Sequence, residues 1–222
     1  MLGINLDVEP GAPLQILCLG AHSDDIEIGC GGTILKLVAE YPQIAAHWIV
    51  FGTTGHRIEE AYASAHEFLR PVENKKILVQ EFRDGFFPYH GVPIKDYFEQ
   101  LKQQVSPDII FTHYRQDLHQ DHRLICELTW NTFRNHLILE YEIPKYDGDL
   151  GVPNFFVHLD ERTCQQKVNY LMTHFGTQQN KDWFTEDTFL SLMRLRGVES
   201  RSPSKYAEAF YGRKLVFSKP GK

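Results

Sequence analysis

The sequence has few cysteines, no excess of basic residues and no long apolar run, and each shortage excludes a class of protein. Its four cysteines include no Cys-x-x-Cys pair, which argues against a disulfide framework or a thiolate zinc site and fits a reducing compartment. The formal charge of −6 gives no general attraction to nucleic acid or anionic membranes. No apolar stretch approaches the roughly 20 residues of a membrane helix, and the first residues lack the basic region of a signal peptide. We therefore expect a cytoplasmic protein with no nucleic-acid partner and no membrane insertion.

Histidine is the residue that the sequence has in excess. There are 11 histidines in 222 residues, and histidine is both the commonest metal ligand and the side chain that titrates near neutral pH. The hydrophobic fraction of 42% and the charged fraction of 23% are close to globular averages, so they exclude a disordered chain, a collagen-like repeat and a coiled coil. We therefore look for histidine clusters in a globular fold.

Short apolar runs alternate with helical patterns over the first part of the chain. The expected strands span residues 15–20, 45–51, 77–79 and 108–112, and the expected helices span residues 26–40, 57–69, 97–105 and 119–133. This alternation predicts an α/β fold with a mostly parallel sheet and helices on both faces. The pattern loosens after Leu139, where we expect loops and two further helices, the second over residues 182–196. We expect a single domain over residues 1–222, whose part from about 140 is an extension that walls a pocket.

Polar residues gather where two of the expected strands end, at residues 21–25 and 113–123. In open α/β sheets, ligands bind just beyond the carboxyl ends of the strands. Two histidines and one carboxylate make a common open zinc site, and His22, Asp25 and His122 could fill it. Asp24, next to a ligand, could take a proton from zinc-bound water.

The second cluster offers a further pair of polar residues. His119 lies three residues before His122 and so on nearly the same side of the expected helix. Protonated, it could stabilise an oxyanion or protonate a leaving amine. Asp121 could orient His119 and raise its pKa.

Each cluster also has a plain structural interpretation. Asp24 or Asp25 could simply cap the helix that follows, and a His-rich turn is more often surface than site. The metal site is favoured because the structural alternative needs two independent coincidences at the same sheet edge. Among other features, the glycines of Gly-Cys-Gly-Gly at residues 29–32 predict close helix packing. Tyr206 and Phe210, four residues apart, fit one face of a helix.

The two clusters are similar to the motifs of a known family. Residues 21–34, AHSDDIEIGCGGTI, resemble the AHPDDExxGxGGT signature of the LmbE-like/PIG-L zinc deacetylases, and HQDHR at residues 119–123 resembles that family's HPDHR. Residues 55–69 match its R-x-E-E helix, while Ser23 replaces the usual proline and Ile26 stands where glutamate is common. The resemblance implies a Rossmann-like fold and a hydrolase of N-acyl groups, usually the acetyl of an N-acetylglucosamine unit.

The resemblance also implies a role for each matching residue. It implies three zinc ligands, which are His22, Asp25 and His122. Asp24 would be the general base, and His119, positioned by Asp121, would stabilise the oxyanion. Arg57 would contact the substrate, and Asp84 stands where the family often has a sugar-binding carboxylate.

Three functions stay open on the sequence. The leading one is a zinc-dependent hydrolase that removes an N-acetyl group from an amino-sugar-containing small molecule. The alternatives are a hydrolase of another N-acyl amide and a metal-binding scaffold protein without catalysis. Two histidines and one aspartate would also accept iron or another divalent ion. A homo-oligomer stays open as well, because relatives of this type often form multimers.

Overall fold

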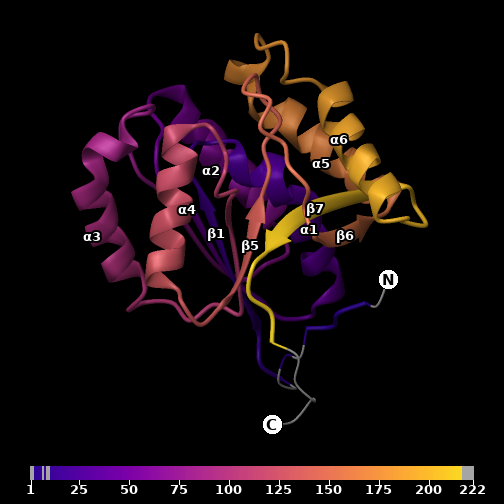
Figure 1. Ribbon diagram of the computed structural model, residues 1–222, viewed down its shortest axis with the longest axis horizontal. Coiled ribbons are helices and arrows are strands. Elements are labelled where there is room, and N and C mark those ends of the chain that lie inside the picture. The colour runs from indigo at the N-terminus through magenta and orange to yellow at the C-terminus, as the bar shows by residue number, and fades with distance from the viewer. Residues whose placement is uncertain (1–2, 7, 9–10, 217–222) are drawn as a thin grey trace.

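The computed structural model describes residues 3–6, 8 and 11–216, which contain a seven-stranded sheet (Figure 1). The strands are β1 (Leu14–Gly20), β2 (Ile44–Val50), β3 (Asn74–Val79), β4 (Ile109–His113), β5 (Leu137–Tyr141), β6 (Phe155–Leu159) and β7 (Tyr206–Gly212). Their order in the sheet is β3-β2-β1-β4-β5-β7-β6. Strands β1 to β5 pair in parallel, whereas β7 is antiparallel to both β5 and β6. The expected α/β fold with a mostly parallel sheet is confirmed.

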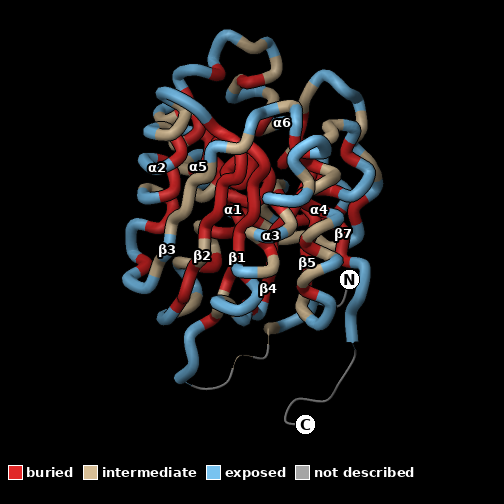
Figure 2. The backbone as a smooth tube through the Cα atoms, turned by 90° about the vertical axis from the view of Figure 1, so that its left-hand side faces the viewer, coloured by how far each residue is buried: buried red, intermediate tan, exposed pale blue. Residues whose placement is uncertain are grey.

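Helices cover both faces of this sheet. Within the described residues the α-helices are α1 (Asp25–Glu40), α2 (His56–Phe68), α3 (Gly91–Leu101), α4 (Gln120–Thr132), α5 (Glu161–His174) and α6 (Glu186–Glu199), with short 3₁₀ helices at Phe87–His90 and Gly176–Gln178. The core on one face is closed by α1, α2, α5 and α6, and the core on the other by α3 and α4 (Figure 1). The central strands and α1 are buried along most of their length (Figure 2). None of the described helices is long and apolar enough to cross a membrane.

The chain after Leu139 holds more sheet than its sequence pattern indicates. Strands β5, β6 and β7 were not expected, and Tyr206 and Phe210 belong to β7 rather than to a helix. The spacing of these two residues is ambiguous, because residues four apart share a face of a strand as well as of a helix. In β7 this spacing places Phe210 in the core, with its ring 5.7 Å from that of Phe111. The helix expected over residues 97–105 begins earlier, at Gly91, and ends at Leu101.

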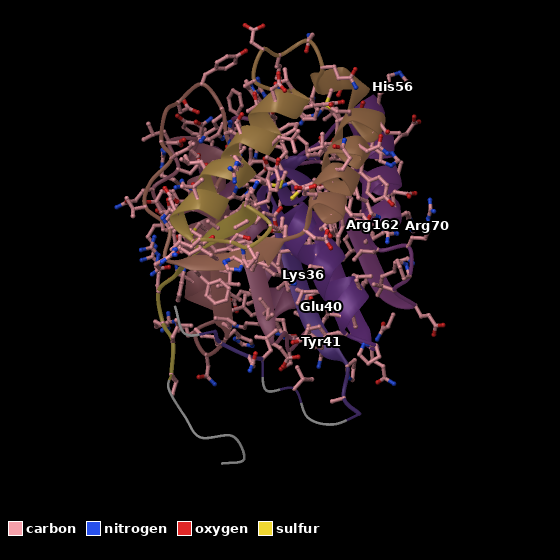
Figure 3. The ribbon with its side chains drawn as sticks, turned by 90° about the vertical axis from the view of Figure 1, so that its right-hand side faces the viewer. Lys36, Glu40, Tyr41, His56, Arg70 and Arg162 are labelled. Atoms are coloured by element: carbon pink, nitrogen blue, oxygen red, sulfur yellow. The ribbon has the colours of Figure 1, made fainter. Side chains whose placement is uncertain are left out.

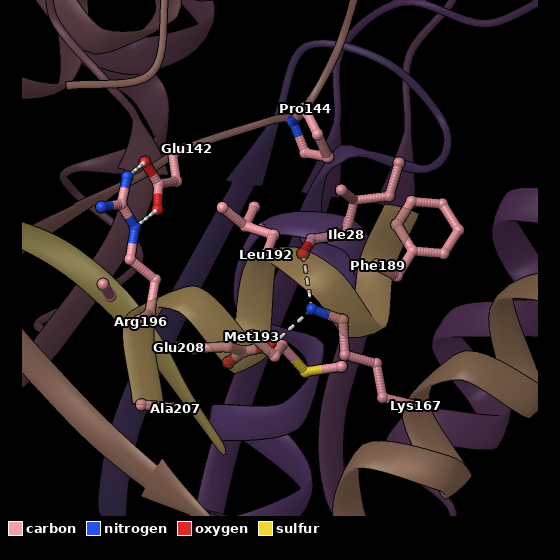
Figure 4. A pocket seen from close by; sticks show the side chains of 12 residues that line it. Ile28, Glu142, Pro144, Lys167, Phe189, Leu192, Met193, Arg196, Ala207 and Glu208 are labelled. Carbon is pink, nitrogen blue, oxygen red and sulfur yellow. Dashed lines mark hydrogen bonds and ion pairs between the residues drawn. The ribbon is translucent and has the colours of Figure 1, made fainter. Parts of the chain in front are cut away.

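A buried ion pair fastens the C-terminal part of the chain to α1 (Figure 4). Lys167 of α5 donates to the Ile28 carbonyl and to Glu208 of β7, each at 2.6 Å. Glu208 in turn accepts the backbone N–H groups of Gly32 at 2.8 Å and Thr33 at 2.6 Å. A Cβ on Gly32 would lie 3.0 Å from the Glu208 carboxylate. The glycine therefore permits the close approach that the sequence predicts for this helix.

A second buried ion pair lies nearby. Arg196 of α6 donates to both carboxylate oxygens of Glu142, at 2.6 and 2.7 Å. The two pairs flank a cavity of about 20 Å³ between α1, α6 and β7 (Figure 4), which is room for about one water molecule. Charge therefore holds β7 against α1, and α6 against the segment that follows β5, in addition to apolar packing.

Candidate active site

The candidate site lies at the carboxyl ends of β1 and β4. Residues 21–24 connect β1 to α1, and residues 114–119 connect β4 to α4. Because β1 and β4 are parallel neighbours, the two polar clusters meet at one edge of the sheet. Asp24 and His119 are the N-cap residues of α1 and α4.

Side-chain atoms of His22, Asp25 and His122 face one another in this edge. His22 Nδ1 lies 3.2 Å from His122 Nε2 and 3.3 Å from Asp25 Oδ2. His122 Nε2 and Asp25 Oδ2 are 3.5 Å apart. Zinc holds such ligands at about 2.0–2.1 Å in a tetrahedral arrangement, which separates the ligand atoms by about 3.3 Å. All three residues are more than nine-tenths buried. Their spacing and donor types therefore fit a zinc ion with its fourth tetrahedral position open.

Asp117 determines which nitrogen of His122 faces the other two residues. The Nδ1–H of His122 donates to Asp117 Oδ2 at 2.9 Å, so Nε2 carries the free lone pair that a metal needs. Burial and the neighbouring His113 lower the pKa of His122 to about 4, which favours the neutral ring. The sequence assigned Asp117 no role, because a carboxylate in a loop between a strand and a helix has no periodicity that marks it.

Asp121 contacts the other candidate ligand rather than His119. Its Oδ2 lies 3.2 Å from His22 Nε2, and its carboxylate accepts the N–H groups of Gly85 at 2.6 Å and Phe87 at 3.0 Å. The expectation was that this carboxylate orients His119. In the structure, the hydrogen bond between the two residues runs instead from the Asp121 backbone N–H to His119 Nδ1, at 3.3 Å.

That backbone hydrogen bond determines the tautomer of His119. A backbone N–H can only donate, so Nδ1 accepts and the proton of the neutral ring lies on Nε2. Burial and the charge of His22 lower the pKa of His119 below its ordinary value. The half-buried ring therefore offers an Nε2–H donor at the mouth of the site.

Asp24 precedes the candidate ligand Asp25 in the chain, and its carboxylate contacts Arg57. Its Oδ1 is 3.3 Å from Arg57 Nη2, and Arg57 Nε donates to Ser23 Oγ at 3.0 Å. Burial and the Asp25 charge raise the pKa of Asp24, while Arg57 opposes that shift. A buried carboxylate of raised pKa can accept a proton, as a general base must.

Arg57 and Asp84 cover the outer side of the cluster. Asp84 Oδ1 lies 3.0 Å from His22 Nε2, and Asp84 Oδ2 lies 3.5 Å from Arg57 Nη1. The hydrogen bond with His22 lowers the pKa of Asp84 to about 2. The Asp84 side chain is 53% exposed, and His56, beside Arg57 at the start of α2, points into solvent (Figure 3). Both residues expected to contact substrate thus stand between the buried cluster and solvent.

His113 belongs to the same cluster but is engaged elsewhere. It is fully buried at the end of β4, and its ring stacks on that of His122 with centroids 3.9 Å apart. Its Nε2 accepts the Ala21 N–H at 2.8 Å, so this lone pair is not free for a metal. Nδ1 of His22 and Nε2 of His122 thus face each other and Asp25, whereas Nε2 of His113 and Nδ1 of His119 accept backbone N–H groups.

Comparison with known proteins agrees with this geometry. A family model, PIG-L, described as GlcNAc-PI de-N-acetylase, matches residues 17–133 and so spans both clusters. The chain belongs to the PIG-L family. Over 169 residues it is 30% identical to the uncharacterized deacetylase YaiS of Escherichia coli, an alignment that covers 72% of this chain and 89% of YaiS. Membership identifies the chain as an N-deacetylase of the PIG-L family.

Solved structures share the fold at lower identity. The N,N'-diacetylchitobiose deacetylase of Pyrococcus horikoshii is 22% identical, with a TM-score of 0.64 over 89% of this chain and 82% of that one. The A40926 pseudoaglycone deacetylase Dbv21 is 15% identical, with a TM-score of 0.70 over 94% of this chain and 100% of its own. GalB of Pseudomonas putida, a 4-carboxy-2-hydroxymuconate hydratase, is 16% identical, with a TM-score of 0.66 over 92% of this chain and 98% of its own. The same fold therefore occurs with more than one reaction, so the substrate and the residue roles have to be argued from the site.

Proposed function

We propose that this PIG-L family deacetylase is a zinc-dependent hydrolase that removes the acetyl group from an N-acetylated amino sugar. The observation that carries the proposal is the spacing of His22, Asp25 and His122, with Asp24 beside them. A structural zinc site uses four protein ligands, whereas three ligands and an adjacent base are typical of a hydrolytic site. A metal-binding scaffold would need neither the base nor the open position.

In this proposal His22, Asp25 and His122 hold the zinc ion. When bound there, zinc supplies a Lewis acid that polarises the amide carbonyl and lowers the pKa of water. Asp24 accepts a proton from the attacking water and later delivers it to the leaving nitrogen, so that the C–N bond breaks into acetate and an amine. The Nε2–H of His119 donates to the oxygen that becomes negative during the attack.

Arg57 and Asp84 are the groups that we assign to the sugar. Both lie between the buried cluster and solvent, and both can bind hydroxyl groups, Arg57 as a donor and Asp84 as an acceptor. The description of the PIG-L family names GlcNAc-PI, and the Pyrococcus horikoshii relative is named for N,N'-diacetylchitobiose. An N-acetylglucosamine unit is therefore the substrate group to test first.

The test is release of acetate from a panel of acetylated compounds by the zinc-loaded chain. The panel contains N-acetylglucosamine, N,N'-diacetylchitobiose, a nucleotide-linked N-acetylglucosamine and simple N-acetylated amines. We expect acetate and free amine in equal amounts from at least one sugar, and none after a chelator has removed the metal. Release from the simple amines alone would contradict the sugar assignment, and no release from any compound would favour the scaffold.

A further inference from the structure

Lys145 is a buried lysine that no part of the proposed mechanism uses. It lies in the segment between β5 and β6, and its side chain is only 9% exposed. Its Nζ lies 3.1 Å from Asp117 Oδ2 and forms a second ion pair with Asp149. Both carboxylates are themselves buried, with side chains 2% and 6% exposed.

These two carboxylates hold the loop that leads into α4. Asp117 accepts the His122 Nδ1–H at 2.9 Å through one oxygen and the His119 N–H at 2.8 Å through the other. Asp149 accepts the N–H of Leu118 at 2.7 Å. Two consecutive residues of the loop, Leu118 and His119, are thus fixed by two carboxylates, and one of these carboxylates also orients a candidate zinc ligand.

Within the described residues, the Lys145 ammonium pairs with both of these buried carboxylates and lies 3.9 Å from the more exposed Asp147. Two carboxylates in a weakly solvated region repel each other, and a buried ion whose partner is removed is strongly destabilised. Without Lys145, separation of Asp117 from Asp149 would relieve the repulsion. That movement would withdraw Asp117 from His122, and a lost carboxylate partner weakens a histidine ligand.

We propose that Lys145 is a positioning residue for the zinc ligand His122, acting through Asp117. This inference rests on the proposed metal site, but its readout is zinc binding and not turnover. It gives the segment between β5 and β6 a role in the metal site, although the candidate ligands themselves lie at residues 22–122.

The test measures the zinc affinity of Lys145→Met by competition with a fluorescent chelator. We expect the affinity to fall about tenfold, the lower end of the effect of removing a partner of a metal ligand. Lys145→Arg, which keeps the cation, should restore most of the affinity. Lys75→Met is the matched control, because Lys75 donates to the Leu69 and Val72 carbonyls at the opposite edge of the sheet. Its zinc affinity should equal that of the wild type.

A double-mutant cycle shows whether Lys145 acts through Asp117. Asp117→Asn alone should weaken zinc binding, and adding Lys145→Met to it should change the affinity by less than about twofold. Additive losses, an unchanged affinity in Lys145→Met or a tighter one would each overturn the inference. If Lys145→Met fails to fold, Lys145→Gln takes its place, with the same loss expected relative to Lys145→Arg.

The outcomes also separate this inference from the proposed function. If the wild-type chain binds no zinc, the metal site itself fails. If the wild type binds zinc and the Lys145 variants bind it equally well, the metal site stands and only the role of Lys145 is wrong.

Discussion

Hydrogen bonds distinguish chemically similar residues of the candidate active-site cluster from one another. Nδ1 of His22 and Nε2 of His122 face each other, whereas Nε2 of His113 accepts a backbone N–H. Asp25 faces the candidate ligand nitrogens, whereas Asp24 faces Arg57. Neighbouring residues of the same type can therefore act as ligand and as base.

The first prediction at the residue scale concerns Asp24. Asp24→Asn removes the proposed base and keeps the side-chain size, so kcat should fall about 10²–10⁴-fold. Bound zinc, measured by elemental analysis, should stay at the wild-type amount because Asp24 is not a proposed ligand. Asp96→Asn, which removes an exposed carboxylate of α3, is the control and should keep full activity. Undiminished turnover in Asp24→Asn would remove Asp24 from the role of base.

The site residues that the sequence predicts lie at different places in the fold from those that it does not predict. His22, Asp25 and His122 follow strand ends, and the rule that ligands bind at such ends in parallel sheets makes them predictable. Asp117 and Lys145 meet only because two loops far apart in the chain fold together. No local pattern encodes that contact. The partner of Asp121 was unpredictable for the same reason, since its contact with His22 spans 99 residues.

At the scale of elements, the ion pair between α5 and β7 also connects both elements to α1 through hydrogen bonds to its backbone. Glu208→Gln would leave the buried Lys167 ammonium uncompensated and should lower the free energy of unfolding by about 3 kcal/mol. Urea denaturation followed by circular dichroism measures the change. Glu40→Gln is the control, because Glu40 pairs with Lys36 on the exposed end of α1 (Figure 3) and should cost less than about 1 kcal/mol. Equal losses of unfolding free energy in the two variants would contradict a stabilising role for the buried ion pair.

The start of α5 gives a prediction with a pH dependence. Asp160 accepts the Thr163 N–H at 2.7 Å as the N-cap, and this bond lowers the pKa of Asp160. Asp160→Ala should therefore cost about 1 kcal/mol at pH 7. A lowered folded-state pKa means that the charged cap stabilises above the ordinary pKa of about 3.9 and loses this effect as the pH falls through the folded value. The difference from wild type should hold between pH 7 and 5 and shrink below about pH 4; a difference that grows on acidification would contradict it.

Helices and strands were predictable where apolar runs alternate regularly with helical patterns. They were not predictable where a strand pairs with strands distant in the sequence. Strands β1, β2 and β4 are mostly apolar, as buried parallel strands are. Strand β7 pairs with β5 and β6, and its spacing of Tyr206 and Phe210 fits a strand and a helix equally well. Only tertiary pairing decides between the two.

At the scale of the whole molecule, zinc should stabilise the folded chain. A ligand present at about 1,000 times its dissociation constant adds about 4 kcal/mol, which for a chain of this size corresponds to roughly 8–16 °C in Tm. Differential scanning fluorimetry of the chelator-treated and zinc-loaded protein measures the shift. Asp25→Asn removes one proposed ligand and should abolish most of it. An unchanged Tm in the wild type at saturating zinc would contradict the site.

The position of β7 in the sheet has a consequence for the order of assembly. Every candidate ligand is present in the chain once residue 122 has been synthesised, and β5 and β6 follow, but β7 is inserted between those two strands. Until β7 arrives, β5 has one unpaired edge and β6 has no strand partner in the sheet, and such edges invite pairing with other chains. The same strand carries Glu208, which holds the helix that begins at Asp25. A nascent chain would therefore contain all the candidate ligands well before it could hold α1 in place, so the metal site is expected to form late in folding.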